Sequence, residues 1–430
     1  MKFKLKPIEK KWILYDIGNS AFALLISTII PIYFNYLAGD AGISEVNYLA
    51  YWGYATSAAT VIVAMLGPLL GTVSDAAGRK KKIFMIALLA GALGCVFLGF
   101  MQSWIWFLLL FVFAKSAYSL SLVIYDSMLT DITSEERMDE VSAQGYAWGY
   151  IGSCVPFICS LLLVLFYDKV GLSMQTAMGI SFFLVAVWWI ALTVPLLKSY
   201  RQTHSRKPAV HAGQSGAQRL GQIFKELREN KTVFYFLLAF FFYIDGVYTI
   251  IDMATAYGTA LGLDTTGLLL ALLLTQIVAF PAALLFGRIS RKVSASRLIL
   301  VCISAYFLIA LYGIGLHRQY QFWILAVCVG CFQGAVQSMS RSYYAKIIPA
   351  EKSGEYFGIY DICGKGASFM GTILVSAVSQ ITGSVNLGVG ALSVMFLAGF
   401  FLFLKADKTE KSEEEQENSG VLFQQPGLGQ

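Results

Sequence analysis

Charged residues are scarce in this chain: Asp, Glu, Lys and Arg make up 13% of its 430 residues, and hydrophobic residues make up 57%. Soluble domains typically carry about 25% charged residues. A single water-soluble core stops growing at roughly 250–300 residues, so it could not bury this much apolar surface. The scarcity of charge therefore excludes an ordinary soluble protein and indicates an integral membrane protein whose main partner is the lipid bilayer.

Residues suited to metal or disulfide chemistry are also few. The three histidines lie in polar segments without the spacing of metal ligands, so we expect no metal site. All seven cysteines lie inside apolar stretches, which argues against a disulfide framework. Cys328 and Cys331 form a C-x-x-C pair, but no second pair or neighbouring histidine completes a metal or redox motif.

Motifs of pumps and common hydrolases are missing from the sequence. It contains neither a G-x4-G-K-[ST] phosphate loop nor a G-x-S-x-G nucleophile turn. We therefore predict a protein that is not an enzyme and requires no cofactor. The net charge of +6 is spread between apolar segments instead of forming one basic face, so no nucleic-acid partner is predicted.

Long apolar stretches fill most of the chain. A membrane-spanning helix needs about 20 mostly apolar residues. The first stretch is too long for the apolar part of a signal peptide, about 7–15 residues, and is predicted to be retained. Twelve stretches qualify as spans, with approximate bounds 12–38, 48–74, 82–101, 104–127, 141–167, 171–197, 232–258, 266–288, 297–316, 320–345, 355–380 and 384–405.

Lys and Arg residues are distributed unevenly between alternate loops. They concentrate near the N-terminus, in the run from Arg79 to Lys82, in segment 198–231 and around Arg291. The other set of loops holds only Lys169 and Arg318. Because cytoplasmic loops of membrane proteins are rich in Lys and Arg, we predict a multi-pass protein of the cell membrane with both termini in the cytoplasm.

One long polar segment divides the spans into two groups of six. Its first part is rich in Ser, Gly and Gln and indicates a linker, whereas Leu220, Ile223, Phe224 and Leu227 have the spacing of a surface helix. The predicted fold is all-α, with twelve transmembrane helices in two pseudo-symmetric six-helix bundles. Its expected parts are a cytoplasmic N-terminus (1–11), a first bundle (12–197), a linker (198–231), a second bundle (232–405) and a disordered acidic tail (406–430).

A short motif follows the second predicted span. Gly71, Asp75, Gly78 and Arg79 stand in the pattern G-x3-D-x-x-G-R, which resembles the loop signature of the major facilitator superfamily. The resemblance implies that this cluster latches the two halves together on the cytoplasmic side. The equivalent position after span eight carries Arg291 instead of an aspartate, so a second latch is not expected.

A narrower resemblance rests on five stretches: WILYDIGNSAF (12–22), SAQGYAWGY (142–150), DGVYTI (245–250), QSMSRS (337–342) and YFGIYD (356–361). Together they are similar to the vacuole-effluxer, or autophagy-related permease, family and its bacterial members. The fungal relative is associated with amino-acid efflux from the vacuole. The resemblance therefore implies a permease-type secondary transporter, with an amino acid as one class of cargo.

Polar and ionisable residues recur on single faces of the spans that line the central cavity in this superfamily. Such residues are costly in hydrocarbon and mark functional sites. Structural pairs remain alternatives: Lys115 with Asp245, Arg341 with Asp361, and Asp361 with Lys365. The predicted cavity residues are Asp16, Asn19, Lys115, Asp245, Tyr248, Gln337, Arg341 and Tyr344.

These features predict a monomeric carrier that moves a small polar, zwitterionic solute by alternating access. Carboxylates of the cavity would meet an ammonium group, and Lys115 and Arg341 a carboxylate. Asp245 is the candidate for proton coupling, because burial in a membrane disfavours a charged carboxylate. A drug or lipid exporter of the same fold and a solute sensor that does not transport remain alternatives.

Overall fold

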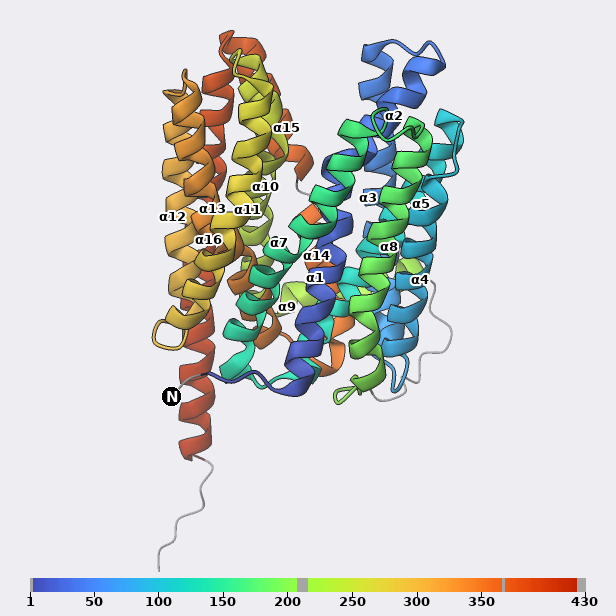
Figure 1. Ribbon diagram of the computed structural model, residues 1–430. Helices are drawn as coiled ribbons and strands as arrows, with labels where there is room; N and C mark the ends of the chain where they lie inside the picture. The colour runs from blue at the N-terminus through green and yellow to red at the C-terminus, as the bar shows by residue number, and fades with distance from the viewer. Residues whose placement is uncertain (1–2, 207–215, 366–367, 424–430) are drawn as a thin grey trace, which may run out of the picture.

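A computed structural model of the chain describes residues 3–206, 216–365 and 368–423 (Figure 1). Helices account for nearly all regular structure in these ranges. The helices are α1 (Pro7–Ser27), α2 (Ile29–Asp40), α3 (Glu45–Ser74), α4 (Lys80–Leu98), α5 (Trp104–Ser127), α6 (Leu129–Ile132), α7 (Glu135–Phe166), α8 (Met174–Ser199), α9 (Gly216–Glu229), α10 (Lys231–Ala260), α11 (Thr265–Ile289), α12 (Ala295–Ile314), α13 (Gln319–Ile347), η1 (Ala350–Lys352), α14 (Ser353–Lys365), α15 (Ser368–Thr382) and α16 (Val385–Phe423).

The predicted spans coincide with the long helices. Eleven segments in the described part of the chain are long and apolar enough to cross a membrane, and Met370–Thr382 is a shorter apolar helix. Span one consists of α1 and α2, which meet at Thr28. Pro31 lacks a backbone N–H and its ring crowds the carbonyl four residues earlier, which accounts for the break there. The predicted span at 355–380 corresponds to α14 and α15.

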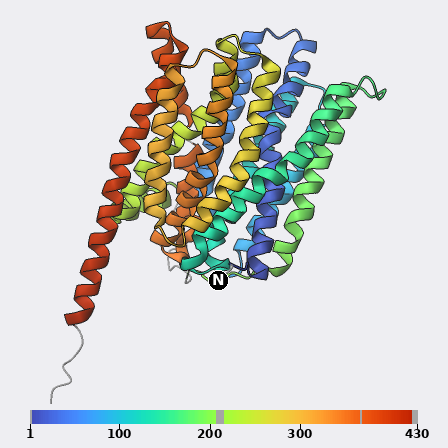
Figure 2. The same cartoon turned by 60° about the vertical axis from the view of Figure 1, so that its left-hand side comes forward.

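The helices form two bundles that stand side by side (Figures 1 and 2). In the first bundle α1 packs against α7 and α8, and α4 against α5. In the second, α16 packs against α10 and α12, and α11 against α13. The all-α, two-bundle fold predicted from the sequence is therefore confirmed.

Both ends of the described chain lie on the same side of the bundles, here named the termini side (Figure 1). The bundles converge on that side and diverge toward the other. Contacts between them are made by α3 with α14, and by α7 with α11 and α13. This arrangement closes the protein on the termini side and places the cavity described below between the halves.

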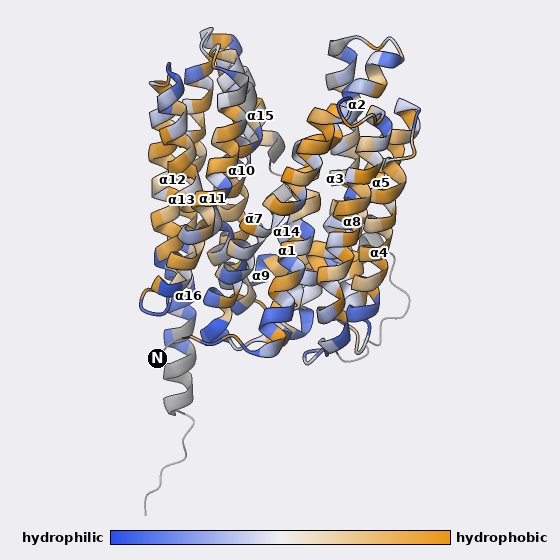
Figure 3. Cartoon of the chain, viewed as in Figure 1, coloured by the Kyte–Doolittle hydropathy of each residue, from blue (hydrophilic) through white to orange (hydrophobic). Residues whose placement is uncertain are grey.

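Apolar residues predominate along the helices, and polar residues gather at the helix ends, most densely on the termini side (Figure 3). Many large apolar side chains are exposed, among them Trp106, Leu165 and Phe401. Such a surface needs an apolar solvent around it. The distribution is that of a multi-pass membrane protein.

The acidic tail differs from its prediction. Residues 406–423 continue α16 as helix, where the sequence indicated disorder. The hydroxyl of Tyr343 donates to Glu410 at 2.6 Å and that of Thr232 donates to Glu413 at 2.8 Å. These bonds hold the first turns beyond the span against the second bundle, and the Glu and Lys residues that follow are good helix formers.

The predicted surface helix is present as α9. Ile223 and Leu227 are buried. Glu226 forms an ion pair with Lys352, with 2.8 Å between the carboxylate oxygen and Nζ. The side chains of Leu220 and Phe224 lie outside the described residues. The helix thus uses part of its apolar face to pack against the protein.

Candidate functional site

A cavity of about 430 Å³ lies between the two bundles. Helices α1, α3, α5 and α7 of the first bundle supply one wall, and α10, α11, α13 and α14 of the second supply the other. Of the predicted cavity residues, six line it: Asp16, Asn19, Lys115, Tyr248, Gln337 and Arg341.

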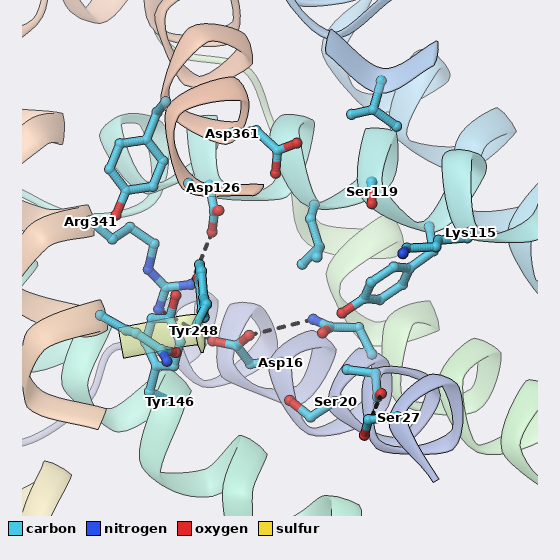
Figure 4. A pocket seen from close by; sticks show the side chains of 18 of the residues that line it. Asp16, Ser20, Ser27, Lys115, Ser119, Asp126, Tyr146, Tyr248, Arg341 and Asp361 are labelled. Carbon is cyan, nitrogen blue, oxygen red and sulfur yellow. Dashed lines mark hydrogen bonds and ion pairs between the residues drawn. The ribbon is translucent and has the colours of Figure 1, made fainter. Parts of the chain in front are cut away.

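The cavity carries both signs of charge. Among the described residues that line it, the basic ones are Lys115 and Arg341, which lie at opposite sides of the space in Figure 4. Its carboxylates come from both bundles: Asp16 and Asp126 from the first, Asp252 and Asp361 from the second. A cavity with separated charges of both signs can hold a solute that carries an ammonium and a carboxylate.

Aromatic rings separate these charges. The cavity is lined by Phe240 and by five tyrosines: Tyr118, Tyr146, Tyr150, Tyr248 and Tyr360. Tyrosine offers an apolar ring together with a hydroxyl, so it can contact both the carbon skeleton and the polar groups of a solute. Tyr150 already donates a hydrogen bond of 3.2 Å to Gln337 of the other bundle.

Arg341 is the most heavily bonded residue of the site, and only 1% of it is exposed. Its Nη1 donates to Asp126 at 3.0 Å and its Nη2 to Asp16 at 3.3 Å. Its Nε donates to the Ser142 hydroxyl at 2.9 Å, and Nη2 also reaches the Ser142 carbonyl at 3.1 Å. A buried guanidinium is tolerated only with such full pairing.

A glycine makes room for this group of charges. A side chain at Gly145 of α7 would overlap the carboxylate of Asp16 and come within 3.0 Å of Nη2 of Arg341. One turn along α7, a side chain at Gly149 would lie 2.7 Å from the Ser20 hydroxyl. The GxxxG pattern at 145–149 therefore serves the close approach of α1 and of Arg341.

Two predicted cavity residues lie elsewhere. Asp245 is fully buried, and its carboxylate accepts hydrogen bonds from the backbone N–H of Gly371 at 2.8 Å and from Thr249 at 3.3 Å. Tyr344 is fully buried as well, donates to the Tyr356 carbonyl at 2.9 Å and stacks on Tyr360. Asp245 faces α15 and Tyr344 faces α14 inside the second bundle, so neither is among the described residues that line the cavity, and a role for them in binding stays a prediction.

The structural pairs considered from the sequence have different outcomes. Lys115 interacts with the charge of Asp252, two turns from Asp245 on α10, and its Nζ lies 5.9 Å from the Phe111 ring centroid. Arg341 pairs with Asp16 and Asp126 in the first bundle, so the alternative of Asp361 as its partner is not what the structure shows. The side chain of Lys365 lies outside the described residues, and its pairing with Asp361 stays a prediction.

The motif after α3 meets the start of α14 on the termini side. The carboxylate of Asp75 accepts hydrogen bonds from the backbone N–H groups of Gly354 and Glu355 at 2.8 and 2.9 Å. A carboxylate satisfies the free N–H groups at a helix start and interacts favourably with its positive end. Burial raises the pKa of Asp75 to about 6, while Lys80 and the two N–H groups lower it.

The glycines of the motif have the expected geometry, but the cation differs. A side chain at Gly71 would overlap the backbone of Gly354, and Gly78 has a φ of +71° in the turn. Arg79 is exposed, and Lys80 is fully buried with its Nζ 3.7 Å from Asp75 and 2.9 Å from the Ser353 hydroxyl. The turn at Gly78 directs the second residue of the basic run inward, so Lys80 and not Arg79 lies beside Asp75.

A second contact joins the bundles where the weak repeat of this motif occurs. Arg291 forms two hydrogen bonds with the carboxylate of Glu140, both at 2.5 Å, and Gly287 packs against Ala143. Lys346 pairs with Asp139 at 2.7 Å nearby. Arg291 thus joins the halves as the cation of an ion pair with Glu140. The motif of the first half has an aspartate at this position, so its repeat does not predict a cation there.

Several lining residues were not predicted as cavity residues: Asp126, Asp252, Asp361, Tyr118, Tyr146, Tyr150 and Tyr360. Helical periodicity places Asp126 on the same face of α5 as Lys115, and Asp252 on the same face of α10 as Asp245, so the sequence does put both aspartates on polar faces. The tyrosines carry no such signal, because aromatic residues are common throughout membrane bundles.

Comparison with known proteins places the chain in a family. Residues 130–417 match the model of the family described as vacuole effluxer Atg22 like. The chain is 39% identical over 416 residues to a protein of Bacillus subtilis named as the uncharacterized MFS-type transporter YxiO, covering 95% of this chain and 97% of that one. It is 25% identical over 321 residues to autophagy-related protein 22 of Coccidioides immitis. This alignment covers 68% of the chain and 52% of the fungal protein, so the chain spans about half the length of that relative.

Solved structures share the fold at low sequence identity. The proton:xylose symporter XylE aligns with a TM-score of 0.71 and 11% identity, over 93% of this chain and 95% of that one. FucP in the outward conformation aligns with a TM-score of 0.70 and 12% identity, over 93% and 97%. The family match, the long bacterial relative and the shared fold agree, and the chain therefore belongs to the vacuole effluxer Atg22-like family of major facilitator superfamily secondary transporters.

Proposed function

We propose that this protein carries a small zwitterionic solute, of the amino-acid class, across the cell membrane by alternating access. The observation that carries the proposal is one cavity between two bundles, lined from both by charges of opposite sign. In such a carrier the halves move against each other around a site at their interface.

Each group of the solute is assigned to a charge of the cavity. Arg341 joins the bundles through Asp16, Asp126 and Ser142, and Lys115, on the opposite side of the cavity, is the cation assigned to the solute carboxylate. Asp252 and Asp361 of the second bundle face the same cavity and are assigned to the ammonium group while the termini side is closed. The tyrosines between them suit the carbon skeleton of an amino acid.

The contacts between the bundles assign this arrangement to the state that is closed on the termini side. Asp75 at the start of α14, Arg291 with Glu140, and Arg341 with Asp16 all cross the interface. In this proposal the termini side faces the cytoplasm, the latch at Asp75 holds it shut, and the carrier acts as a monomer in the cell membrane.

Counterflow in proteoliposomes tests the cargo. Vesicles containing the purified protein are loaded with a mixture of unlabelled amino acids and exposed to one labelled amino acid at a time. Accumulation of a label above its level in protein-free vesicles is the expected result. Binding detected by thermal shift without any counterflow would favour a sensor, and flux of lipophilic cations in place of amino acids would favour a drug exporter.

Proton coupling is the finer part of the proposal. Because Asp245 is bonded inside the second bundle, the cavity carboxylates Asp252 and Asp361 are better placed to exchange protons with a solute pathway. An imposed pH gradient is expected to drive uptake in the wild-type protein. The variants Asp252→Asn and Asp361→Asn test each carboxylate separately. If a variant still catalyses counterflow but its uptake no longer responds to the pH gradient, the substituted aspartate is the coupling residue.

A further inference from the structure

Arg341 extends from the second bundle into a site built by the first. Its hydrogen-bond partners are Asp16 on α1, Asp126 on α5 and Ser142 on α7. The rings of Trp12 and Tyr146 lie 4.6 and 4.3 Å from its guanidinium carbon. Every one of these contacts crosses between the bundles, and they define what we name the Arg341 socket: Trp12, Asp16, Asp126, Ser142 and Tyr146.

The socket opens onto the transport cavity. Asp16, Asp126, Tyr146 and Arg341 all line the cavity, and Figure 4 shows the two carboxylates on either side of the guanidinium, facing the same space. Asn19, which also lines the cavity, donates to Asp16 at 3.4 Å. A solute in the cavity can therefore reach the carboxylates that hold Arg341.

Opening on the termini side requires the bundles to separate, and Arg341 must then leave its socket. Asp16 and Asp126 would then lose the guanidinium, in a site whose rings and carboxylates suit a positive charge. We propose that Arg341 is a tethered cation that closes the termini side, and that the ammonium group of the solute replaces it at Asp16 and Asp126 when that side opens. The exchange with the ammonium group rests on the proposed function, whereas the closing role of Arg341 does not.

Electron-spin distance measurements test the closing role without any solute. Spin labels at Glu136→Cys and Lys292→Cys, exposed on the termini side of the first and second bundles, report separation in a background where the seven native cysteines are replaced. Arg341→Gln is expected to raise the ratio of long to short distances about tenfold or more, because it removes the buried cation that joins Asp16 and Asp126 to the second bundle. Arg341→Lys should lie between this variant and the wild type.

A matched variant shows whether Arg341 differs from other pairs between the bundles. Lys346→Gln removes a cation from the same helix and breaks its ion pair with Asp139. The side chains of Lys346 and Asp139 are 26% and 10% exposed. Because exposed pairs contribute little, its ratio is expected to change less than about threefold. An unchanged ratio in Arg341→Gln, or an equal change in Lys346→Gln, overturns the closing role.

Gly145→Ala tests the closing role of Arg341 without removing any charge. The added methyl group would overlap Asp16 and press on Arg341, so it should expel the guanidinium and raise the long-distance fraction. Gly53→Ala, at a glycine with open space around it, is the control. A Gly145→Ala protein that folds and stays closed like the wild type contradicts the proposal even if Arg341→Gln fails to fold.

Two small probes test the exchange of cations. Ethylammonium chloride is expected to raise the long-distance fraction of the wild type, and sodium propionate to leave it unchanged. The Asp16→Asn, Asp126→Asn double variant should not respond to ethylammonium. No response of the wild type, or an equal response to propionate, overturns the exchange; amino-acid counterflow in the same preparation shows independently whether the proposed function holds.

Discussion

The carboxylate of Asp245 accepts a 2.8 Å hydrogen bond from the backbone N–H of Gly371, in the first turn of α15. This bond connects the middle of α10 to α15. Thr249, one turn further along α10, donates to the same carboxylate at 3.3 Å. Asp245 therefore links α10 to α15 inside the second bundle.

Asp245→Asn tests this structural role. An asparagine oxygen can accept the same hydrogen bond, so transport, its response to a pH gradient and the melting temperature should stay close to wild type. Asp245→Ala leaves the Gly371 N–H without this acceptor and should lower stability by about 1–3 kcal/mol. Thermal unfolding of the purified variants measures the difference. A normally stable Asp245→Asn that no longer responds to pH would return proton coupling to this residue.

Lys115→Ala should abolish counterflow while the protein is still expressed and folded. A charge-assisted hydrogen bond to a carboxylate contributes about 1.5–3 kcal/mol, so affinity for the solute should fall by roughly 10- to 100-fold. Lys198→Ala, an exposed basic residue at the end of α8, should transport normally. Wild-type counterflow by Lys115→Ala would remove Lys115 from the site.

Gly71→Ala should weaken closure on the termini side. The new methyl group would overlap the carbonyl of Gly354, which is backbone and cannot rotate away. The expected penalty on the closed arrangement is about 1–3 kcal/mol, the usual range for an overpacked contact. The spin-label pair at 136 and 292 measures it as an increase in long distances.

Gly67→Ala is the matched control, because it lies one turn earlier on α3 and its methyl group would meet the Gly358 carbonyl at an ordinary 3.6 Å. Equal behaviour of the two alanine variants would show that the contact between Gly71 and Gly354 does not control closure.

The same distances should depend on pH through Asp75. Burial raises its pKa to about 6 in the closed arrangement, and exposure to water on opening would return it to roughly 3.9. The closed form then binds the proton more tightly, so its added stability is present at low pH and is lost as the pH rises through about 6. Lowering the pH from about 7.5 to 5.5 should favour closure about fourfold.

Asp75→Asn should remove this pH response, because the amide does not titrate in that range. A response of the opposite sign in the wild type, with more opening in acid, would mean that protonation releases Asp75 from the start of α14.

Periodicity along each helix was enough to find much of the site. Asp16 and Asn19 share a face of α1, and Gln337 and Arg341 share a face of α13, and all four line the cavity. Periodicity does not give depth along a span, however. Asp245 and Asp252 are seven residues apart and therefore on nearly the same face of α10, but α15 covers the first and leaves the second facing the cavity.

The choice of partners for each charge was beyond sequence reasoning. Arg341 was considered with Asp361 and is instead bound by Asp16 and Asp126. The motif at the end of α3 contains Arg79, but the residue buried beside Asp75 is the neighbouring Lys80. Adjacent residues on a helix point about 100° apart, and only the helices packed around them decide which one faces inward.

The sequence by itself determined that this protein is a bundle of membrane helices in two halves, because long apolar stretches can satisfy their backbone in lipid only as helices. Its motifs also determined the family. The tertiary structure alone decided that Arg341 of one bundle binds a site of the other and that Asp75 meets the start of α14. Those contacts join residues hundreds of positions apart, and their energies depend on distances between helices that no local pattern in the chain encodes.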